Sequence, residues 1–101
     1  MQGEMPDFDQ MYRLYGDRVQ FLMVNLTVSE YGVEYVQSVI KAEGFQFPVL
    51  FDLYGTAADA YGVEYIPYTF FIDSEGGLIT AVNKKLDAPF LEQMIAQMLA
   101  E

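Results

Sequence analysis

Two aspartates that end apolar runs are the first residues of this sequence that suggest chemistry. Asp52 closes the run 47–52, and Asp73 closes the run 69–73. If both runs are strands of one sheet, the two carboxylates lie at its carboxyl-end rim, where α/β proteins place their sites. A carboxylate pair does acid–base work only when burial separates the two pKa values. Turn and cap roles explain each aspartate more simply, and we favour that interpretation.

The residue types that carry most enzyme chemistry are absent. The 101 residues contain no cysteine and no histidine. The sequence therefore offers no thiolate, no disulfide, and neither the usual general base nor the commonest zinc ligand. Its acids do not follow the spacing of a calcium loop, and no helix directly follows Gly76-Gly77 to make a phosphate cradle. We expect no catalytic residue, no metal and no cofactor.

The first half of the chain predicts two helices around a strand. Helical spacing of apolar residues predicts a helix from Pro6 to Gly16 and another over 29–43, with Gly44 as its stop. Between them, the run 19–26 is apolar without alternation, which is typical of a near-central strand covered on both faces.

The middle of the chain predicts an edge strand and a connecting helix. Pro48 cannot donate a backbone hydrogen bond, so the run 47–52 belongs at a sheet edge. Residues 56–61, followed by Gly62, are typical of a short helix that ends at a glycine.

The last third predicts a hairpin and a helix. Strand 69–72 turns through Gly76-Gly77, where glycines supply positive φ angles, and strand 78–82 returns antiparallel. Asp87 can cap a final helix with Pro89 in its first turn and an apolar stripe that reaches Leu99.

This order of elements predicts one α/β domain over residues 1–101, a three-layer α/β/α sandwich around a mixed sheet of about four strands. Fifteen acidic residues against five basic ones give a formal charge of −10, which repels phosphate backbones and anionic lipid heads. No apolar run approaches the roughly 20 residues that cross a bilayer, and no signal segment is visible. We expect neither a nucleic-acid nor a membrane partner.

Five segments occur in a characteristic order: 3–8, 24–26, 47–52, 60–63 and 66–73. Together they resemble thioredoxin-like thiol–disulfide oxidoreductases of the TlpA and ResA kind, within the redoxin superfamily. The resemblance implies a thioredoxin-like fold in which Pro67 follows a cis peptide bond and faces the redox cysteines. It also implies that Ile66, Pro67 and Tyr68 hold an extended substrate and that Glu30 is a candidate acid for tuning the redox site. Purely structural roles for Pro67, Tyr68 and Glu30 remain the simpler interpretation.

The sequence departs from that family at the redox site. In the family a central strand and a Cys-x-x-Cys motif precede the helix that here begins near Pro6, and Met1 stands about where the second cysteine is expected. Thiol–disulfide exchange needs an attacking thiolate and a resolving thiol, so we predict a redox-inactive chain. The missing central strand would leave unpaired edges on strands 19–26 and 69–73. These either close up or recruit a second chain, and a homodimer is the expected partner.

Two functions therefore follow from the sequence. The first is a thioredoxin-like domain of the oxidoreductase family that lacks its dithiol, as a truncated or degenerate relative. The alternative is a redox-inactive module that binds an extended peptide or protein client at the Ile66–Tyr68 corner. Relatives of this kind usually act outside the cytoplasm, but the sequence itself leaves the compartment open.

Overall fold

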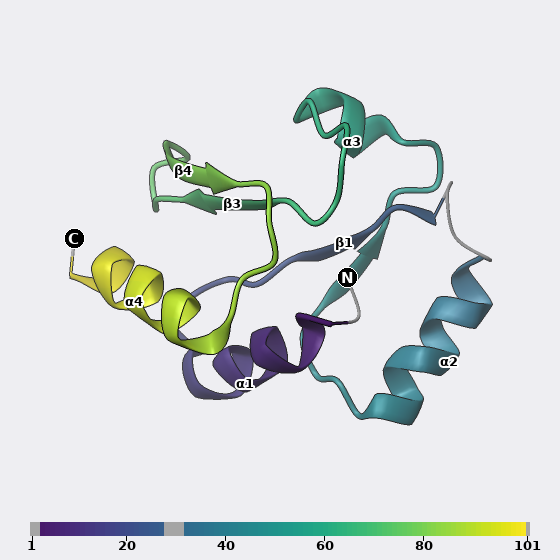
Figure 1. The fold of residues 1–101 in the computed structure, drawn as a ribbon, viewed down its shortest axis with the longest axis horizontal. Helices are drawn as coiled ribbons and strands as arrows, with labels where there is room; N and C mark the ends of the chain where they lie inside the picture. Colours follow the sequence, from purple (N-terminus) through teal and green to yellow (C-terminus); the bar gives the residue numbers. More distant parts are fainter. Residues whose placement is uncertain (1–2, 28–31, 101) are drawn as a thin grey trace.

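The structure is a computed structural model that describes residues 3–27 and 32–100 of the chain. Helices and strands follow the predicted order: α1 (Met5–Tyr15), β1 (Met23–Asn25), α2 (Val33–Glu43), β2 (Val49–Phe51), α3 (Thr56–Ala60), β3 (Thr69–Ile72), β4 (Leu78–Val82) and α4 (Ala88–Leu99). Figure 1 shows α1 and α4 along the lower side of the strands and α3 above them. The predicted α/β class is confirmed.

The four strands form two separate pairs instead of the single mixed sheet expected from the sequence. β1 pairs with β2 in parallel, and β3 pairs with β4 antiparallel. No backbone ladder joins β1 to β3 within the described residues. Met23 of β1 and Phe71 of β3 instead contribute to one hydrophobic core that α1 shares. The two halves are thus held together by side-chain packing, because a backbone ladder forms only between strands about 4.8 Å apart.

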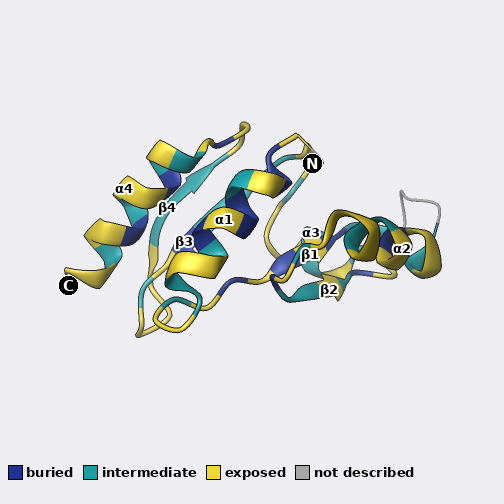
Figure 2. Ribbon diagram, turned by 90° about the horizontal axis from the view of Figure 1, so that it is seen from below, coloured by how far each residue is buried: buried dark blue, intermediate teal, exposed yellow. Residues whose placement is uncertain are grey.

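The core lies between the strands and the two helices α1 and α4. Figure 2 shows the buried residues of both helices on the faces that turn toward the strands. Tyr15 of α1 also donates a hydrogen bond from Oη to Glu92 Oε2 of α4, at 2.8 Å. The buried cluster contains Met5, Phe8, Met11, Phe21, Met23, Phe47, Phe71, Leu86, Leu91 and Ile95.

The prediction that strand 19–26 is covered on both faces is wrong. β1 is only three residues long, and burial alternates along it: Met23 and Asn25 are buried, whereas Val24 is exposed. Leu22, which precedes the strand on the same face as Val24, is 56% exposed. The core on the α1 side buries one face of β1, and the described residues leave its other face open to water.

Several helix ends follow the local signals in the sequence. Gly44 ends α2 in the left-handed conformation with φ of 73°. Asp87 caps α4 by accepting a hydrogen bond from the N–H of Phe90 at 3.0 Å. Gly16 ends α1 for a different reason, since its φ is −62° and a Cβ there would lie 2.6 Å from the carbonyl oxygen of Tyr12. A close approach, and no special backbone angle, requires glycine at that position.

The hairpin between β3 and β4 uses its two glycines differently. Gly76 has a φ of +86°, as expected, but Gly77 is not in the positive-φ region, contrary to the prediction. A Cβ on Gly77 would lie 2.8 Å from Asp73 Oδ2, because the Asp73 carboxylate folds over this turn. The turn therefore needs one glycine for its backbone angle and the other for space.

Replacing Gly76 by alanine should lower the free energy of unfolding by about 1–2 kcal/mol, because an L-residue in the left-handed region places its Cβ against the following carbonyl. Chemical denaturation of both proteins measures the difference. Ser74→Ala, an exposed change in the same turn, is the matched control and should have little effect. Equal stabilities of Gly76→Ala and the parent chain would contradict the turn described here.

Candidate functional site

The corner that leads into β3 is the best-formed candidate site. The Ile66-Pro67 peptide bond is cis, as the resemblance implied. The side-chain amide of Asn83, which follows β4, donates hydrogen bonds from Nδ2 to the carbonyl oxygens of Pro67 at 2.7 Å and Tyr65 at 3.1 Å. Asn83 therefore fastens both ends of the corner to the strand beside it.

Tyr68 packs within a group of aromatic rings. Its ring stacks on Phe70 with centroids 4.8 Å apart, and Tyr61 meets the same Phe70 ring edge-on at 5.0 Å. Tyr68 is only partly exposed. The structural interpretation of this residue thus has direct support, since the ring is held by its neighbours.

The corner presents apolar surface and free backbone to the solvent. Ile66 is 46% exposed and Tyr65 is 72% exposed. Within the described residues, neither the N–H nor the C=O of Ile66 has a hydrogen-bond partner. An exposed backbone N–H and C=O beside apolar side chains is the arrangement that an extended peptide can pair with.

Asp52 and Asp73 are each occupied in their own loops. Asp52 is buried, and its Oδ2 accepts a hydrogen bond from the N–H of Ala58 in α3 at 2.9 Å. Asp73 Oδ1 accepts from the N–H groups of Glu75 at 2.9 Å and Gly77 at 2.8 Å. These contacts support the cap and turn roles that we favoured, and none of them joins the two carboxylates. Glu30, the candidate tuning acid, lies outside the described residues.

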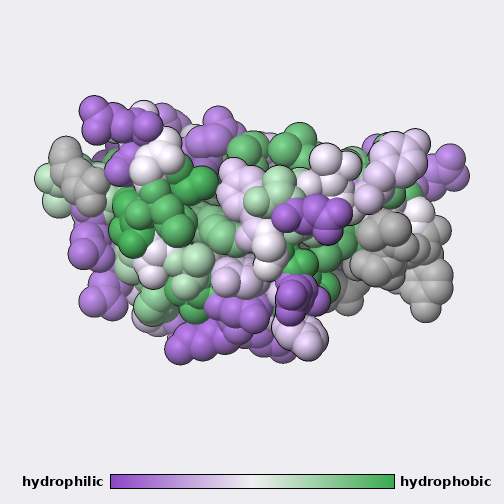
Figure 3. All heavy atoms as spheres, turned by 90° about the horizontal axis from the view of Figure 1, so that it is seen from above, coloured by the Kyte–Doolittle hydropathy of each residue, from purple (hydrophilic) through white to green (hydrophobic). Residues whose placement is uncertain are grey.

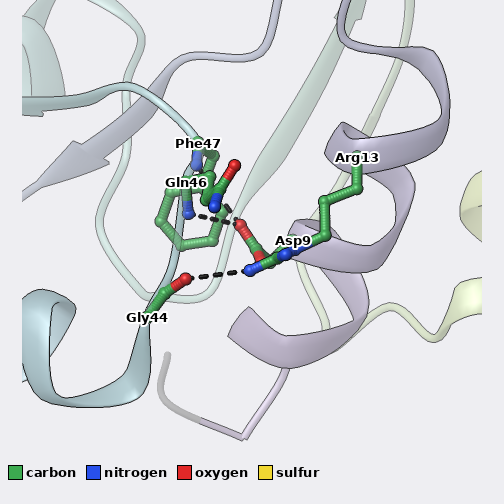
Figure 4. A network of polar contacts seen from close by, with 5 residues as sticks. All are labelled: Asp9, Arg13, Gly44, Gln46 and Phe47. Atoms are coloured by element: carbon green, nitrogen blue, oxygen red, sulfur yellow. Dashed lines mark hydrogen bonds and ion pairs between the residues drawn. The ribbon is translucent and has the colours of Figure 1, made fainter.

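Sequence reasoning missed a buried acid on α1. The Asp9 side chain, in a residue only 5% exposed, accepts hydrogen bonds at Oδ1 from the N–H groups of Gln46 at 2.7 Å and Phe47 at 3.3 Å. Arg13 Nε donates to Asp9 Oδ2 at 2.7 Å, and Arg13 Nη2 donates to the carbonyl of Gly44 at 2.9 Å. Figure 4 shows how this network ties α1 to the segment between α2 and β2.

The pKa of Asp9 follows from these contacts. Burial by itself raises the pKa of the carboxyl, but the hydrogen bonds from Gln46, Arg13 and Phe47 and the Arg13 charge outweigh it. The pKa lies below its ordinary value of 3.8 as a result. The spacing of Asp9 and Arg13, four residues apart on one helix, was a signal for the ion pair, but no local pattern indicates the partners 37 and 38 residues away.

Two further acids, one just before α1 and one in its first turn, also serve the fold. Glu4, only 5% exposed, accepts from the N–H of Leu86 at Oε2, at 3.0 Å, and Asp7 Oδ2 accepts from the N–H of Ala88, at 3.0 Å. They border a surface pocket of about 430 Å³ whose rim includes Lys84 and Lys85. Each acid thus uses one carboxylate oxygen to hold the backbone at the start of α4.

Neither a metal cluster nor a membrane-spanning helix is found among the described residues. No group of three or more acidic side chains in the described ranges is placed to hold a metal ion. Among the helices of residues 3–27 and 32–100, none is long and apolar enough to cross a bilayer.

The strand pairs, the helices around them and the cis-proline corner define a thioredoxin-like fold. The structure superposes on the crystal structure of StoA from Bacillus subtilis with a TM-score of 0.85 at 27% identity, covering 93% of this chain and 71% of that chain. Residues 1–81 match the AhpC/TSA family, and the chain belongs to that family. The resemblance seen in the sequence is confirmed.

Curated relatives agree with this assignment. The chain is 32% identical over 74 residues to the sporulation thiol-disulfide oxidoreductase A of Bacillus subtilis, covering 72% of this chain and 45% of the relative. It is 34% identical over 88 residues to the thiol-disulfide oxidoreductase ResA of Geobacillus thermodenitrificans, covering 83% of this chain and 49% of the relative. The chain thus spans about half the length of the curated relatives it matches.

Proposed function

We propose that this chain is a thioredoxin-like domain that has no thiol–disulfide exchange activity of its own and that holds an extended polypeptide at the Ile66–Tyr68 corner. One observation carries the proposal: the corner is fully formed and fastened by Asn83, although the 101 residues contain no cysteine. A binding role uses what the chain retains, whereas catalysis requires groups that it lacks.

The chain has no sulfur group that can form or break a disulfide bond. In thiol–disulfide exchange a thiolate attacks one sulfur of a disulfide, the other sulfur leaves as a thiolate, and a second thiol then resolves the mixed disulfide. The six methionines of the chain supply only thioether sulfur, which has no proton to lose and forms no disulfide. No residue of the chain can take either role.

The binding argument rests on the exposed corner. The free N–H and C=O of Ile66 can pair with an extended peptide backbone, and the Ile66 and Tyr65 side chains offer apolar contact beside it. The formal charge of −10 favours a client segment with basic residues, because complementary charge speeds association and excludes acidic competitors.

The test combines two measurements on the 101-residue chain. In an insulin-reduction assay with dithiothreitol, we expect a rate equal to that of dithiothreitol alone, while a relative with its dithiol intact serves as the active control. Measurable turnover by the chain would refute the redox-inactive part of the proposal.

The second measurement follows binding of a lysine-containing extended peptide by fluorescence anisotropy. Asn83→Ala removes both hydrogen bonds that fasten the corner, at about 1 kcal/mol each, so the affinity should fall about fivefold to thirtyfold. Lys84→Ala, a change at the neighbouring exposed position, is the matched control and should change the affinity by much less. Equal losses for the two variants would mean that the peptide does not bind at the corner.

A further inference from the structure

The segment 83–88, which we call the strap, links β4 to α4 and is held at both ends. Before α4 begins it forms neither helix nor strand, and Figure 1 shows it running from the end of β4 down to the start of α4. At its first residue, the side-chain amide of Asn83 donates hydrogen bonds to the carbonyl oxygens of Pro67 and Tyr65. The strap is therefore fastened directly to the Ile66–Tyr68 corner.

Two carboxylates at the start of α1 hold the other end of the strap. Glu4, just before the helix, accepts a hydrogen bond at Oε2 from the N–H of Leu86 at 3.0 Å. Asp7, in the first turn, accepts at Oδ2 from the N–H of Ala88 at 3.0 Å. Leu86 is only 4% exposed, and its side chain belongs to the hydrophobic core. Water cannot easily replace a lost acceptor there, so the carboxylates help to keep this end in place.

The two lysines of the strap do not fasten it through ion pairs. Lys84 and Lys85 are exposed, and neither forms an ion pair with another residue in the ranges 3–27 and 32–100. Lys85 Nζ lies against Gly3 instead, where an added Cβ would be 2.7 Å away. The strap is thus held by its backbone N–H groups, the Leu86 side chain and the Asn83 amide.

The corner that the strap holds begins the β3–β4 hairpin, which carries apolar surface of its own. Ile72 of β3 is 39% exposed, and Leu78 of β4 is 62% exposed. Figure 3 shows hydrophobic atoms gathered over the end of the molecule where β3 and β4 lie. Because ordering a binding surface at the moment of binding costs affinity, a corner that Asn83 fixes in advance binds an extended peptide more tightly.

We propose that Glu4 and Asp7 are positioning residues for peptide binding, which hold the Ile66–Tyr68 corner in place through the strap. This inference rests on the peptide-binding function proposed above. The two carboxylates do not contact the peptide. They fix the strap two and four residues after Lys84, so that Asn83 has little freedom to leave the corner. When one anchor is lost, the corner is fastened for a smaller fraction of the time, and the apparent affinity falls by that fraction.

The first test removes the anchor at Asp7, which is only half-buried and so is the less disruptive of the two to change. The lysine-containing peptide is titrated into the 101-residue chain and followed by fluorescence anisotropy. Asp7→Ala should lower the affinity at least about threefold, which corresponds to a corner fastened about one third of the time. Asp7→Asn keeps an oxygen that can accept the N–H of Ala88, so it should restore most of the affinity.

Asp9→Ala is the matched control, because it removes another carboxylate of α1 that holds distant backbone. The partners of Asp9 are the N–H groups of Gln46 and Phe47, which lie between α2 and β2 and not in the strap. We expect Asp9→Ala to lose at least as much stability as Asp7→Ala and yet to keep the affinity of the parent chain. The comparison separates positioning of the corner from general loss of stability.

Two NMR measurements test the strap itself. In the absence of peptide, Asp7→Ala should move the side-chain amide signals of Asn83 toward those of a solvent-exposed asparagine, whereas Asp9→Ala should not move them. In the parent chain, added peptide should slow hydrogen exchange of the Leu86 and Ala88 amides at least about threefold, because coupling between two sites is reciprocal. The Gln46 amide, which is bonded to Asp9, should change little.

Three outcomes would overturn the inference. One is an affinity of Asp7→Ala within about twofold of that of the parent chain. The second is an equal loss of affinity in Asp9→Ala, which would mean that binding simply follows stability. The third is an Asn83 side-chain signal that stays unchanged in Asp7→Ala. If the parent chain does not bind the peptide at all, the proposed function fails, and the Asn83 signal alone decides whether the strap holds the corner.

Discussion

Replacing Leu91 by alanine is expected to lower the free energy of unfolding by about 3 kcal/mol, the largest effect that we anticipate from a single core change. Leu91 is 1% exposed and is the largest fully buried side chain of the described residues. It lies on α4, in the same buried cluster as residues of α1 and β3. Removing it takes away buried apolar atoms and leaves a cavity that the surrounding helices fill only partly.

The loss of stability in Leu91→Ala is large relative to the total stability expected for this fold. A domain of this size has a typical free energy of unfolding of about 5–15 kcal/mol. In the part of the chain that the structure describes, no backbone ladder links the two strand pairs, so the shared core holds them together. We therefore expect that Leu91→Ala also weakens the connection between the pairs, which hydrogen exchange should detect as faster exchange in β3 and β4.

The matched control is Leu99→Ala, which makes the same chemical change in the same helix at a residue that is 39% exposed. It should cost well under half as much, because less apolar surface returns to water and no closed cavity forms. Urea denaturation of the parent chain and the two variants measures both values. If the two variants lose the same stability, the core is not arranged as described.

Replacing Asp9 by alanine is expected to cost on the order of 2–3 kcal/mol at neutral pH. The change removes the acceptor for the N–H groups of Gln46 and Phe47 and the partner of Arg13. Phe47 is only 4% exposed, so water cannot easily replace the lost acceptor at its N–H. The Arg13 side chain is 52% exposed, so its ion pair contributes the smaller part.

The charge of Asp9 makes part of this stability depend on pH. Because the folded state lowers the pKa below 3.8, the contribution is complete above that value and is lost as pH falls through the lower, folded-state pKa. Asp9→Asn keeps the shape of the side chain but cannot ionise. The difference in unfolding free energy between the parent chain and Asp9→Asn should therefore be constant near neutral pH and should shrink below pH 3.8.

Asp17→Ala is the control for this pair of variants, since Asp17 is exposed, and its removal should leave stability nearly unchanged. Urea denaturation at several acidic and neutral pH values gives both results. A difference between the parent chain and Asp9→Asn that grows as the pH falls would have the wrong sign and would contradict the network in Figure 4.

Local signals in the sequence predicted the hairpin and the helix ends well. Strands 69–72 and 78–82 match β3 and β4, and Asp87 caps α4 as expected. Each of these features depends on residues close together in the chain: a glycine turn, an aspartate three residues before its partner, or an apolar stripe at helical spacing. Such short-range patterns specify the local backbone geometry without reference to the rest of the fold.

The candidate site was predicted only in part. Ile66, Pro67 and Tyr68 do form an exposed corner with a cis bond, but Asn83, which fastens it, gave no signal in the sequence. Its partners lie 16 and 18 residues earlier, across the hairpin. The strand predicted over 19–26 is longer than β1 for a related reason. An apolar run does not indicate which of its residues form backbone hydrogen bonds with another strand.

The amino-acid sequence by itself determined the absence of thiol and imidazole chemistry, the order of helices and strands, and the resemblance that the AhpC/TSA match confirms. Only the tertiary structure decided that the described strands form two pairs and that Asp9 joins α1 to residues 37 and 38 positions away. The physical reason is the sequence distance over which each interaction acts. Composition and short spacing determine the chemistry and the secondary structure of a segment, whereas contacts between distant segments depend on how all segments pack into one core.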